Sequence, residues 1–500
     1  MSGALKAFRG CALPSRAWRL AGERWDDGVR GTDPERREIP LRRRRSLRLE
    51  AAGFRWVKHA RRTEHAGPLQ PYADITHIAV APKAIWVGMR RDTWLLRRKH
   101  FEDPQGPEHL FTALYRAILA QPDGPAQWQR IAAVEERATH PARRIATAGV
   151  VVVCLAVMAL QWLDPFVTDV ASFVPELVAH GEWWRAITGN LLHSPVLFPF
   201  HIASNLLLIV GFAFLVGRPL GSLRTLLVMA AAGLGSMAAS AFAGYDEVIG
   251  ASGMAAGLVG AELALELRFG ERLPASWRLS RPLFFSVLVL QAGIDLLIPF
   301  IAGAAHIGGF VVGYAMTLVL APAAFAGESP SPRLRFAVAA TLAIVATSLV
   351  VPLPLMLRDP AALSRHGRAV LASEDTGPGR SNDLAWRMLT ESQLSPDQAQ
   401  VAVALAERAV AETERQNPDI LDTLAEALFV QGDQHGALEV IDEAIGLDAD
   451  ETYYIEQRRR YRGERAFDDR PAPPAMPWFL RAPEEPALRV FIDPSSGVEI

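Results

Sequence analysis

The sequence predicts a mainly α-helical membrane protein, in which a bundle of helical spans lies between a small α+β domain and a C-terminal helical domain. Half of the 500 residues are apolar, and most of these fall between about residues 145 and 357. Before this region, short runs of β-branched and aromatic residues alternate with turn residues. After it, apolar residues recur at helical spacing. The formal net charge of -2 is the sum of an Arg-rich N-terminal part and an acidic C-terminal part.

Residues 1–45 are Arg-rich and have no helical or strand period, so we expect a disordered tail. The run Arg42–Arg45 fits a solvated tail, which is the commoner case, or contact with anionic lipid headgroups. Residues 46–122 predict several strands followed by one helix at 108–119. This order weakly resembles a pleckstrin-homology-like module, which implies an interaction or regulatory domain. A plain structural addition to the chain is the commoner case and stays open. Residues 123–144 are expected to be a linker.

Seven hydrophobic segments are long enough to cross the roughly 30 Å hydrocarbon core of a bilayer as helices. Six belong to a core at residues 145–325, and the seventh follows a loop within 326–357. The predicted spans are Ile145–Leu163, Phe200–Val216, Thr225–Gly244, Gly250–Leu267, Leu283–Phe300, Gly303–Pro322 and Phe336–Leu357.

The distribution of arginine among the connecting loops predicts the orientation of these spans. Arginines lie before span one and between spans two and three, four and five, and six and seven, whereas the alternate loops are mainly acidic. By the positive-inside rule the N terminus is cytoplasmic and the C terminus is external or periplasmic. We therefore expect a multi-pass protein of the cell membrane, with Ser252 and His306 near the outer face.

The region after residue 357 is predicted to be soluble. Residues 358–381 are expected to be a linker, and residues 382–463 have the small and large apolar spacing of about two tetratricopeptide-like helix pairs. Two repeats are few for a freestanding solenoid, so packing against the membrane domain or a protein partner is expected. Residues 464–500 predict a Pro-rich extended tail.

Two polar residues in long apolar sequence are the leading candidates for chemistry. Ser252 lies in Gly250-Ala251-Ser252-Gly253, and His306 follows Ala305. A hydroxyl and an imidazole in lipid must find partners, and a serine beside a base can act as a nucleophile. Because no carboxylate is close to either residue in sequence, a two-member Ser-His dyad is the simplest expectation.

Further residues complete the predicted site. His201 and Asn205 are four residues apart on one helical face, so with the Ser252 backbone N–H they can form an oxyanion hole. Small-xxx-small spacing permits close contact between the two helices that carry Ser252 and His306. The glycines expected to allow it are Gly253, Gly257, Gly309 and Gly313. Cys11 and Cys154 are the only cysteines and provide no disulfide framework or zinc site, so we expect no metal site built on them.

Together these motifs resemble the rhomboid family of intramembrane serine proteases over residues 145–325. Gly250-Ala251-Ser252-Gly253 matches Gly-x-Ser-Gly, and Ala305-His306 with Gly309 and Gly313 matches Ala-His-x-x-Gly-x-x-x-Gly. His201 and Asn205 match His-x-x-x-Asn, and Trp184-Arg185 matches the Trp-Arg of the first outer loop.

The resemblance implies a six-span catalytic core, no cofactor, and cleavage of transmembrane segments of other membrane proteins near small residues. Two features depart from the family pattern. His193 lies eight residues before His201 rather than four or five, so the inner part of the first outer loop is expected to pack differently. An acidic residue common near the start of span three is missing.

Each candidate also has a structural interpretation. Ser252 alone is more often a helix-packing serine, and Trp184-Arg185 is expected to be an interfacial anchor that supports its loop. Glu262, Glu266 and Asp295 are near span ends and are expected to be solvated or paired, without a chemical role.

Three functions remain open from the sequence: an active protease, a catalytically silent scaffold that binds transmembrane clients, and a small-solute transporter. Retention of Ser252 and His306 favours the protease over the scaffold. The absence of evident inverted repeats disfavours the transporter. Nucleic-acid binding is not expected, because the basic residues come with many acidic ones and no nucleic-acid motif.

Overall fold

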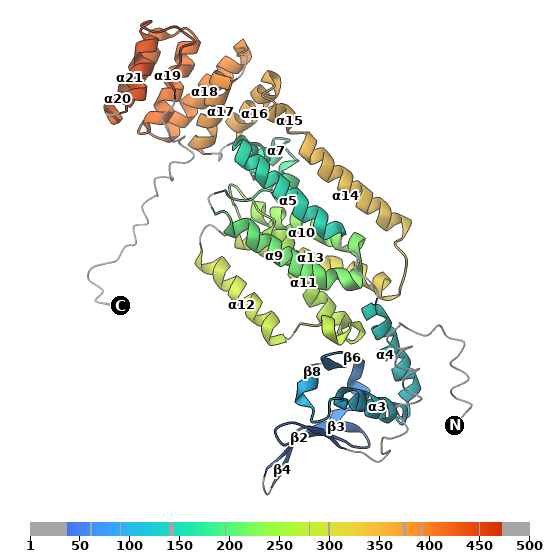
Figure 1. The fold of residues 1–500 in the computed structure, drawn as a ribbon. Helices are drawn as coiled ribbons and strands as arrows, with labels where there is room; N and C mark the ends of the chain where they lie inside the picture. Colours follow the sequence, from blue (N-terminus) through green and yellow to red (C-terminus); the bar gives the residue numbers. More distant parts are fainter. Residues whose placement is uncertain are drawn as a thin grey trace. The chain divides into compact units, whose positions relative to one another are not determined.

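The computed structural model describes residues 38–472, apart from 61–62, 91, 140–144, 196, 280, 299–300, 374–376, 392–393 and 450. The chain divides into two compact units. The first combines the N-terminal domain with most of the membrane helices, and the second combines residues 160–189 and 246–248 with the C-terminal helices. Figure 1 shows these elements in sequence colours. The predicted Pro-rich tail lies largely outside the described residues.

The N-terminal domain contains two antiparallel sheets and two helices. The first sheet has β1 (Glu38–Leu41), β2 (Arg45–Leu49), β3 (Gly53–His59) and β4 (Glu64–Ala66) in order, with β5 (Gln70–Pro71) paired to β3. The second has the order β6 (Ile75–Ala81), β7 (Ala84–Met89) and β8 (Thr93–Arg97). The helices are α3 (Gly106–Leu119) and α4 (Gly124–Thr139). The strands and the following helix agree with the predicted α+β domain.

The domain is larger at both ends than the sequence indicated. Its first strand begins at Glu38, inside the predicted disordered tail, and Arg42–Arg44 form the turn of the β1–β2 hairpin. Arg43 and Arg44 have φ of 64° and 56°, so the arginine run includes a tight turn with left-handed backbone. At the other end, α4 occupies most of the predicted linker because Trp128 and Ile131 bury against the sheets and α3.

The domain also contacts the loop between α11 (Ser252–Phe269) and α12 (Arg281–Leu297). His77 is fully buried, and its Nδ1 accepts a hydrogen bond of 2.9 Å from the Ala275 N–H. Its other ring nitrogen, Nε2, must then carry the proton that it donates to Glu135, 2.7 Å away. Arg278 donates to the Met89 carbonyl at 2.6 Å. These contacts hold the short segment that connects two membrane helices.

The membrane region consists of helices at every predicted span. They are α5 (Ile145–Leu163), α9 (Phe200–Leu220), α10 (Ser222–Phe242), α11, α12, α13 (Gly303–Phe325) and α14 (Pro332–Val350). Within the first unit α9, α10, α11 and α13 pack together (Figure 1). Within the described part of the chain, five segments have the length and composition of a membrane span: α5, α9, α10, α13 and Pro332–Met356, which joins α14 to the short α15 (Leu353–Met356).

The other two predicted spans are less apolar or shorter. Helix α11 has 18 residues, and three of them are the charged Glu262, Glu266 and Arg268. The apolar part of α12 is limited to Phe284–Leu297. Helix α11 is nevertheless the most enclosed, because its glycines and alanines are buried against its neighbours. Its burial by protein explains why it can carry more polar residues than a helix that faces lipid.

In the second unit, the segment after α5 forms three short helices, α6 (Phe166–Ala171), α7 (Pro175–Ala179) and α8 (Arg185–Thr188). An isolated bridge pairs Phe173 with Val248. The C-terminal domain contains α16 (Pro360–Ala372), α17 (Pro378–Glu391), α18 (Pro396–Glu412), α19 (Pro418–Val430), α20 (Gln434–Leu447) and α21 (Thr452–Tyr461). Helices begin inside the predicted linker 358–381, because Asp359 caps α16 by accepting from the Ala362 N–H.

Candidate active site

Ser252 is the first residue of α11 and is half-buried. Gly250, two residues earlier, has φ of 130°, a region in which a side chain is strained. A Cβ added to Gly250 would lie 2.9 Å from His201 Nε2 and 3.5 Å from Asn205 Nδ2. Only glycine therefore fits this turn, and its absent side chain leaves space for the His201 and Asn205 side chains beside Ser252.

Helices α11 and α13 are in backbone contact through the predicted glycines. A Cβ on Gly309 would lie 2.2 Å from the Gly253 carbonyl oxygen, and one on Gly313 would lie 2.0 Å from the Gly257 oxygen. Both distances are too short for any side chain. His306 lies in the first turn of α13 and is 9% exposed. Because Ser252 precedes Gly253 and His306 precedes Gly309 by less than one turn, the two candidates start from adjacent ends of touching helices.

His201 and Asn205 lie in the first turns of α9, on the face predicted by their spacing. His201 Nδ1 accepts the Ser194 N–H at 3.1 Å, so the neutral ring has its proton on Nε2, the atom that faces Gly250. Asn205 is 4% exposed, and its Nδ2 has no hydrogen-bond partner among the described residues. Two N–H donors thus converge on the Gly250–Ser252 turn.

Asp295, to which the sequence assigned no chemical role, lies beside His306. Its Oδ1 lies 2.7 Å from His306 Nδ1 and accepts a second hydrogen bond of 2.8 Å from Gln291 Nε2. This contact agrees with the expectation that Asp295 is solvated or paired. The expectation that no carboxylate lies near Ser252 or His306 is wrong, because Asp295 contacts the His306 ring. Asp295 and His306 are eleven residues apart on different helices, and neither motif nor period connects them.

His193 packs against the oxyanion-hole candidate. Its ring is fully buried, and its centroid lies 5.3 Å from that of His201 in an edge-on arrangement. Burial, together with the neighbouring His201, lowers the pKa of His193 to about 4. His193 is therefore neutral at pH 7, and its imidazole packs edge-on against that of His201.

Trp184 and Arg185 cross-link their own loop. Trp184 Nε1 donates to the Val170 carbonyl at 2.9 Å. Arg185 is fully buried, donates to the Asp169 carbonyl at 2.7 Å, and pairs with Glu182 at 2.6 Å. The expectation of an interfacial anchor is wrong for Arg185, because the guanidinium is enclosed by loop carbonyls. Its supporting role in the loop agrees with the prediction.

The remaining predicted carboxylates are on α11. Glu266 Oε1 accepts the Leu279 N–H at 2.9 Å and closes the end of the α11–α12 loop. Glu262 is only 1% exposed, and its Oε1 has no partner among the described residues. The expectation that Glu262 is solvated or paired is therefore wrong for this oxygen.

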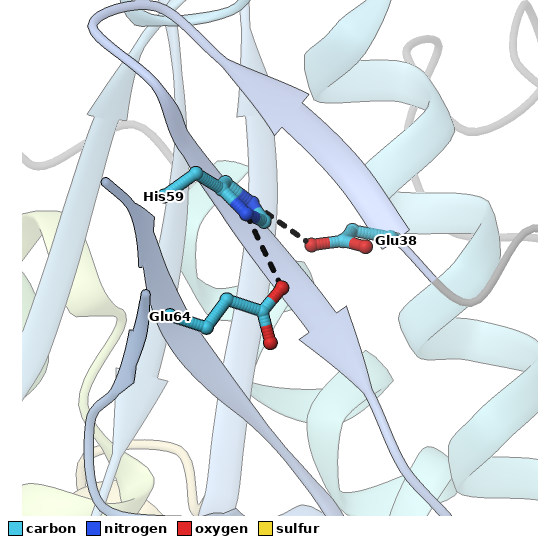
Figure 2. Close-up of side chains that lie close together, drawn as sticks. All are labelled: Glu38, His59 and Glu64. Carbon is cyan, nitrogen blue, oxygen red and sulfur yellow. Dashed lines mark ion pairs between the residues drawn. The ribbon is translucent and has the colours of Figure 1, made fainter. Parts of the chain in front are cut away.

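Among the residues that the structure describes, one group of potential metal ligands occurs, on the N-terminal sheet, where Figure 2 shows Glu38, His59 and Glu64. Their ligand atoms lie within 4.8 Å of one another. Arg48 pairs with Glu64 at 2.6 Å and with Glu38 at 3.6 Å. The guanidinium already supplies the positive charge that the two carboxylates require, so this cluster is an ion-pair network on the face of the sheet.

Comparison with known proteins finds similarity in the central region. Residues 180–323 match the family model described as Rhomboid domain. The chain is 33% identical over 139 residues to Rhomboid protease GluP of Bacillus subtilis (strain 168), and this match covers 28% of this chain and 26% of that protein. It is 30% identical over 146 residues to RHOMBOID-like protein 6, mitochondrial, of Arabidopsis thaliana, which covers 29% of this chain and 46% of that protein.

A shorter match has higher identity. The chain is 41% identical over 92 residues to Putative rhomboid protease YdcA of Bacillus subtilis (strain 168), which covers 18% of this chain and 45% of that protein. The chain thus spans between about a quarter and just under half of the length of these relatives. The matched segment contains every candidate site residue described above, and the apolar helices around it make the chain a multi-pass membrane protein.

Proposed function

We propose, from the similarity of residues 180–323 to the Rhomboid domain family model, that the protein is a rhomboid-type intramembrane serine endopeptidase. Its substrates are the transmembrane segments of single-span or other membrane proteins. Ser252 is the nucleophile and His306 the general base. His201, Asn205 and the Ser252 backbone N–H stabilise the oxyanion.

The observation that carries the proposal is the convergence of two N–H donors on the start of α11, one of which has no partner among the described residues. Asn205 Nδ2 is buried without a partner among the described residues, and His201 Nε2–H faces the same turn. A buried, unpaired amide N–H₂ costs about 1–3 kcal/mol. An unpaired donor at this position is explained if it binds an acceptor that forms only during the reaction. The oxyanion that develops beside Ser252 is such an acceptor.

The residues divide the reaction as follows. Ser252 Oγ attacks the scissile carbonyl carbon while His306 takes the hydroxyl proton. The carbonyl oxygen becomes an oxyanion held by the Asn205 and His201 donors. The intermediate collapses when His306 returns the proton to the leaving amine, leaving an acyl-enzyme on Ser252. Water activated by His306 then releases the second product and restores the serine.

We also propose the orientation predicted by the arginine distribution, with the N terminus cytoplasmic. Two sets of contacts support it. The N-terminal domain holds the α11–α12 loop, which the positive-inside rule assigns to the cytoplasm. Helix α17 of the C-terminal domain contacts residues assigned to the outside, because Arg380 pairs with Glu247 at 3.1 Å and donates to the Asp169 carbonyl at 2.8 Å.

The test uses the purified full-length protein in liposomes with a single-span substrate. We expect cleavage by the wild type and none above background by Ser252→Ala or His306→Ala. A fluorophosphonate probe should label the wild type and not Ser252→Ala. Cleavage that persists in Ser252→Ala contradicts the proposal. A wild type that binds the substrate but neither cleaves it nor reacts with the probe identifies the alternative, a catalytically silent scaffold.

A further inference from the structure

We infer that Asp295 is a positioning residue for His306, so that this protein uses a Ser-His-Asp arrangement completed from a separate membrane helix. The inference rests on the proposed function. It begins with the 2.7 Å contact between Asp295 Oδ1 and His306 Nδ1. This distance is typical of a hydrogen bond in which one partner is ionised.

The hydrogen bonds around Asp295 determine which group is the donor in the bond between Asp295 Oδ1 and His306 Nδ1. Gln291 Nε2 lies 2.8 Å from Asp295 Oδ1 and 3.3 Å from His306 Nδ1. The amide N–H therefore has its shorter contact with the carboxylate, and His306 Nδ1 is left with the carboxylate as its nearer partner. A carboxylate only accepts, so Nδ1 must be the donor. His306 Nε2 is then the unprotonated nitrogen, as a general base requires.

The surroundings of Asp295 favour this role over a structural ion pair. Its side chain is 17% exposed and that of His306 is 11% exposed. Across the described part of the chain, no lysine or arginine forms an ion pair with Asp295, so His306 is its cationic partner when protonated. Gly303 makes room for the carboxylate, because a Cβ there would lie 3.2 Å from Asp295 Cβ. A carboxylate in an apolar helix is costly unless it has a partner and a use.

The chemical consequence concerns both the tautomer and the charge of His306. The carboxylate holds the proton on Nδ1, which keeps Nε2 free to accept the Ser252 proton. When His306 becomes an imidazolium in the transition state, the adjacent negative charge stabilises it. No proton moves to Asp295. The residue acts on Ser252 only through His306.

Two substitutions and a matched control separate positioning from folding. Asp295→Asn keeps the shape but removes the charge and offers an N–H₂ that can donate to Nδ1, which would place the proton on the wrong nitrogen. Asp295→Glu keeps the carboxylate. Ser286→Ala changes an exposed hydroxyl on the same helix, which donates to the Pro282 carbonyl one turn earlier.

In proteoliposomes we expect Asp295→Asn to lower kcat by about 10²–10⁴-fold, the usual contribution of acid-base catalysis, with KM nearly unchanged. Asp295→Glu should recover part of this loss, and Ser286→Ala should behave as wild type. The ¹⁵N spectrum of His306 should show protonated Nδ1 in the wild type and a changed tautomer in Asp295→Asn.

Wild-type kcat and an unchanged His306 spectrum in Asp295→Asn overturn the inference. If Ser252→Ala still abolishes cleavage in that case, the proposed protease function stands without a role for Asp295. The inference is also overturned if Asp295→Asn and Asp295→Glu raise KM and lower stability to the same extent as each other while the His306 tautomer stays unchanged. That result would assign Asp295 a structural role. If neither the wild type nor any variant cleaves or labels, the proposed function fails first and the positioning role fails with it.

Discussion

At the scale of single residues, the amide of Asn205 separates two interpretations of a buried polar group. As a packing residue it would satisfy its own N–H groups within the protein, and as an oxyanion donor it would keep one unpaired. The structure leaves Nδ2 without a partner among the described residues, 3.5 Å from the position of a Gly250 Cβ. The donor interpretation therefore explains a cost that the packing interpretation does not.

Asn205→Ala should lower kcat about 10²–10³-fold, because one oxyanion donor is lost, and should raise thermal stability slightly or leave it unchanged, because an unpaired polar group is removed. The control is Ser204→Ala on the same helix, where the exposed hydroxyl donates to the His201 backbone carbonyl. Single-turnover cleavage and thermal unfolding measure the two effects. A variant that is unstable but as active per folded molecule as wild type would contradict the donor role.

Asp422 in the C-terminal domain provides a second residue-scale prediction. Burial, with the nearby Glu426, raises the pKa of Asp422 to about 8. The folded protein therefore keeps a proton that the unfolded chain has lost above pH 4, so this group makes stability fall as pH rises toward 8. Asp422 accepts from Tyr453 Oη at 3.1 Å and from Gln457 Nε2 at 3.2 Å.

Asp422→Asn should remove this pH dependence, because an amide stays neutral, and its oxygen can still accept one of these bonds. Between pH 6 and 8 the slope of unfolding free energy should become flatter by up to about 1.4 kcal/mol per pH unit. Hydrogen exchange of α19 in the full-length protein measures the slope. Asp442→Asn, an exposed position on α20, is the control and should leave it unchanged.

At the scale of elements, the contact between α11 and α13 is the part of the fold that the sequence described best. Small residues four apart on two apolar segments predict close helix packing, and glycine carbonyls indeed lie where Cβ atoms would be. Local patterns also contained the strands, the helix pairs and the His201–Asn205 face. In each case the signal is a short-range period that the backbone geometry imposes.

Features made by distant residues were missed for a physical reason. Asp295 meets His306 because α12 and α13 place them together, and no spacing rule joins residues on different helices. Arg42–Arg45 looked like a solvated run because charge and composition do not reveal a hairpin turn. The burial of Arg185 could not be predicted, because the Asp169 and Ser172 carbonyls that enclose its guanidinium lie more than ten residues away in sequence.

Gly309→Ala tests the helix contact. The added methyl would lie 2.2 Å from the Gly253 carbonyl oxygen, so α11 and α13 must separate or shift. We expect a loss of about 1–3 kcal/mol in stability from overpacking and a larger fall in kcat than in substrate binding. Gly211→Ala on α9 is the control, since an added Cβ there meets nothing within 4 Å. Retention of wild-type kcat in Gly309→Ala would show that close approach is not needed for catalysis.

At the scale of the whole molecule, the loop between α5 and α9 and the C-terminal domain share a buried ionic cluster. Glu182 pairs with Arg185 at 2.6 Å, and its other oxygen lies 2.6 Å from His366 Nδ1 on α16. Burial raises the pKa of Glu182, but hydrogen bonds from His366 and Arg185 outweigh it and lower the pKa to about 2. The loop that precedes the candidate oxyanion hole is thus tied to a helix that lies almost 200 residues later.

His366 makes this tie sensitive to acid. Burial lowers the pKa of His366, and the nearby Arg185 and Arg380 lower it further against the opposing effect of Glu182. A neutral imidazole therefore donates Nδ1–H to Glu182 in the folded state. Since the unfolded histidine takes up a proton near pH 6.5, its contribution to stability is complete above that pH and is lost as the pH falls. The sign is opposite to that of Asp422.

Acidification from pH 7.5 to 5.5 should therefore increase hydrogen exchange in residues 175–189 and in α16, by up to about tenfold per pH unit if opening is controlled by this one proton. His366→Gln keeps an N–H donor that cannot titrate, so it should abolish the acid response of both segments together. His435→Gln, an exposed position on α20, should retain it. An acid response that survives in His366→Gln would assign the effect to another group. A response in α16 alone would show that residues 175–189 keep their structure without the contact to the C-terminal domain.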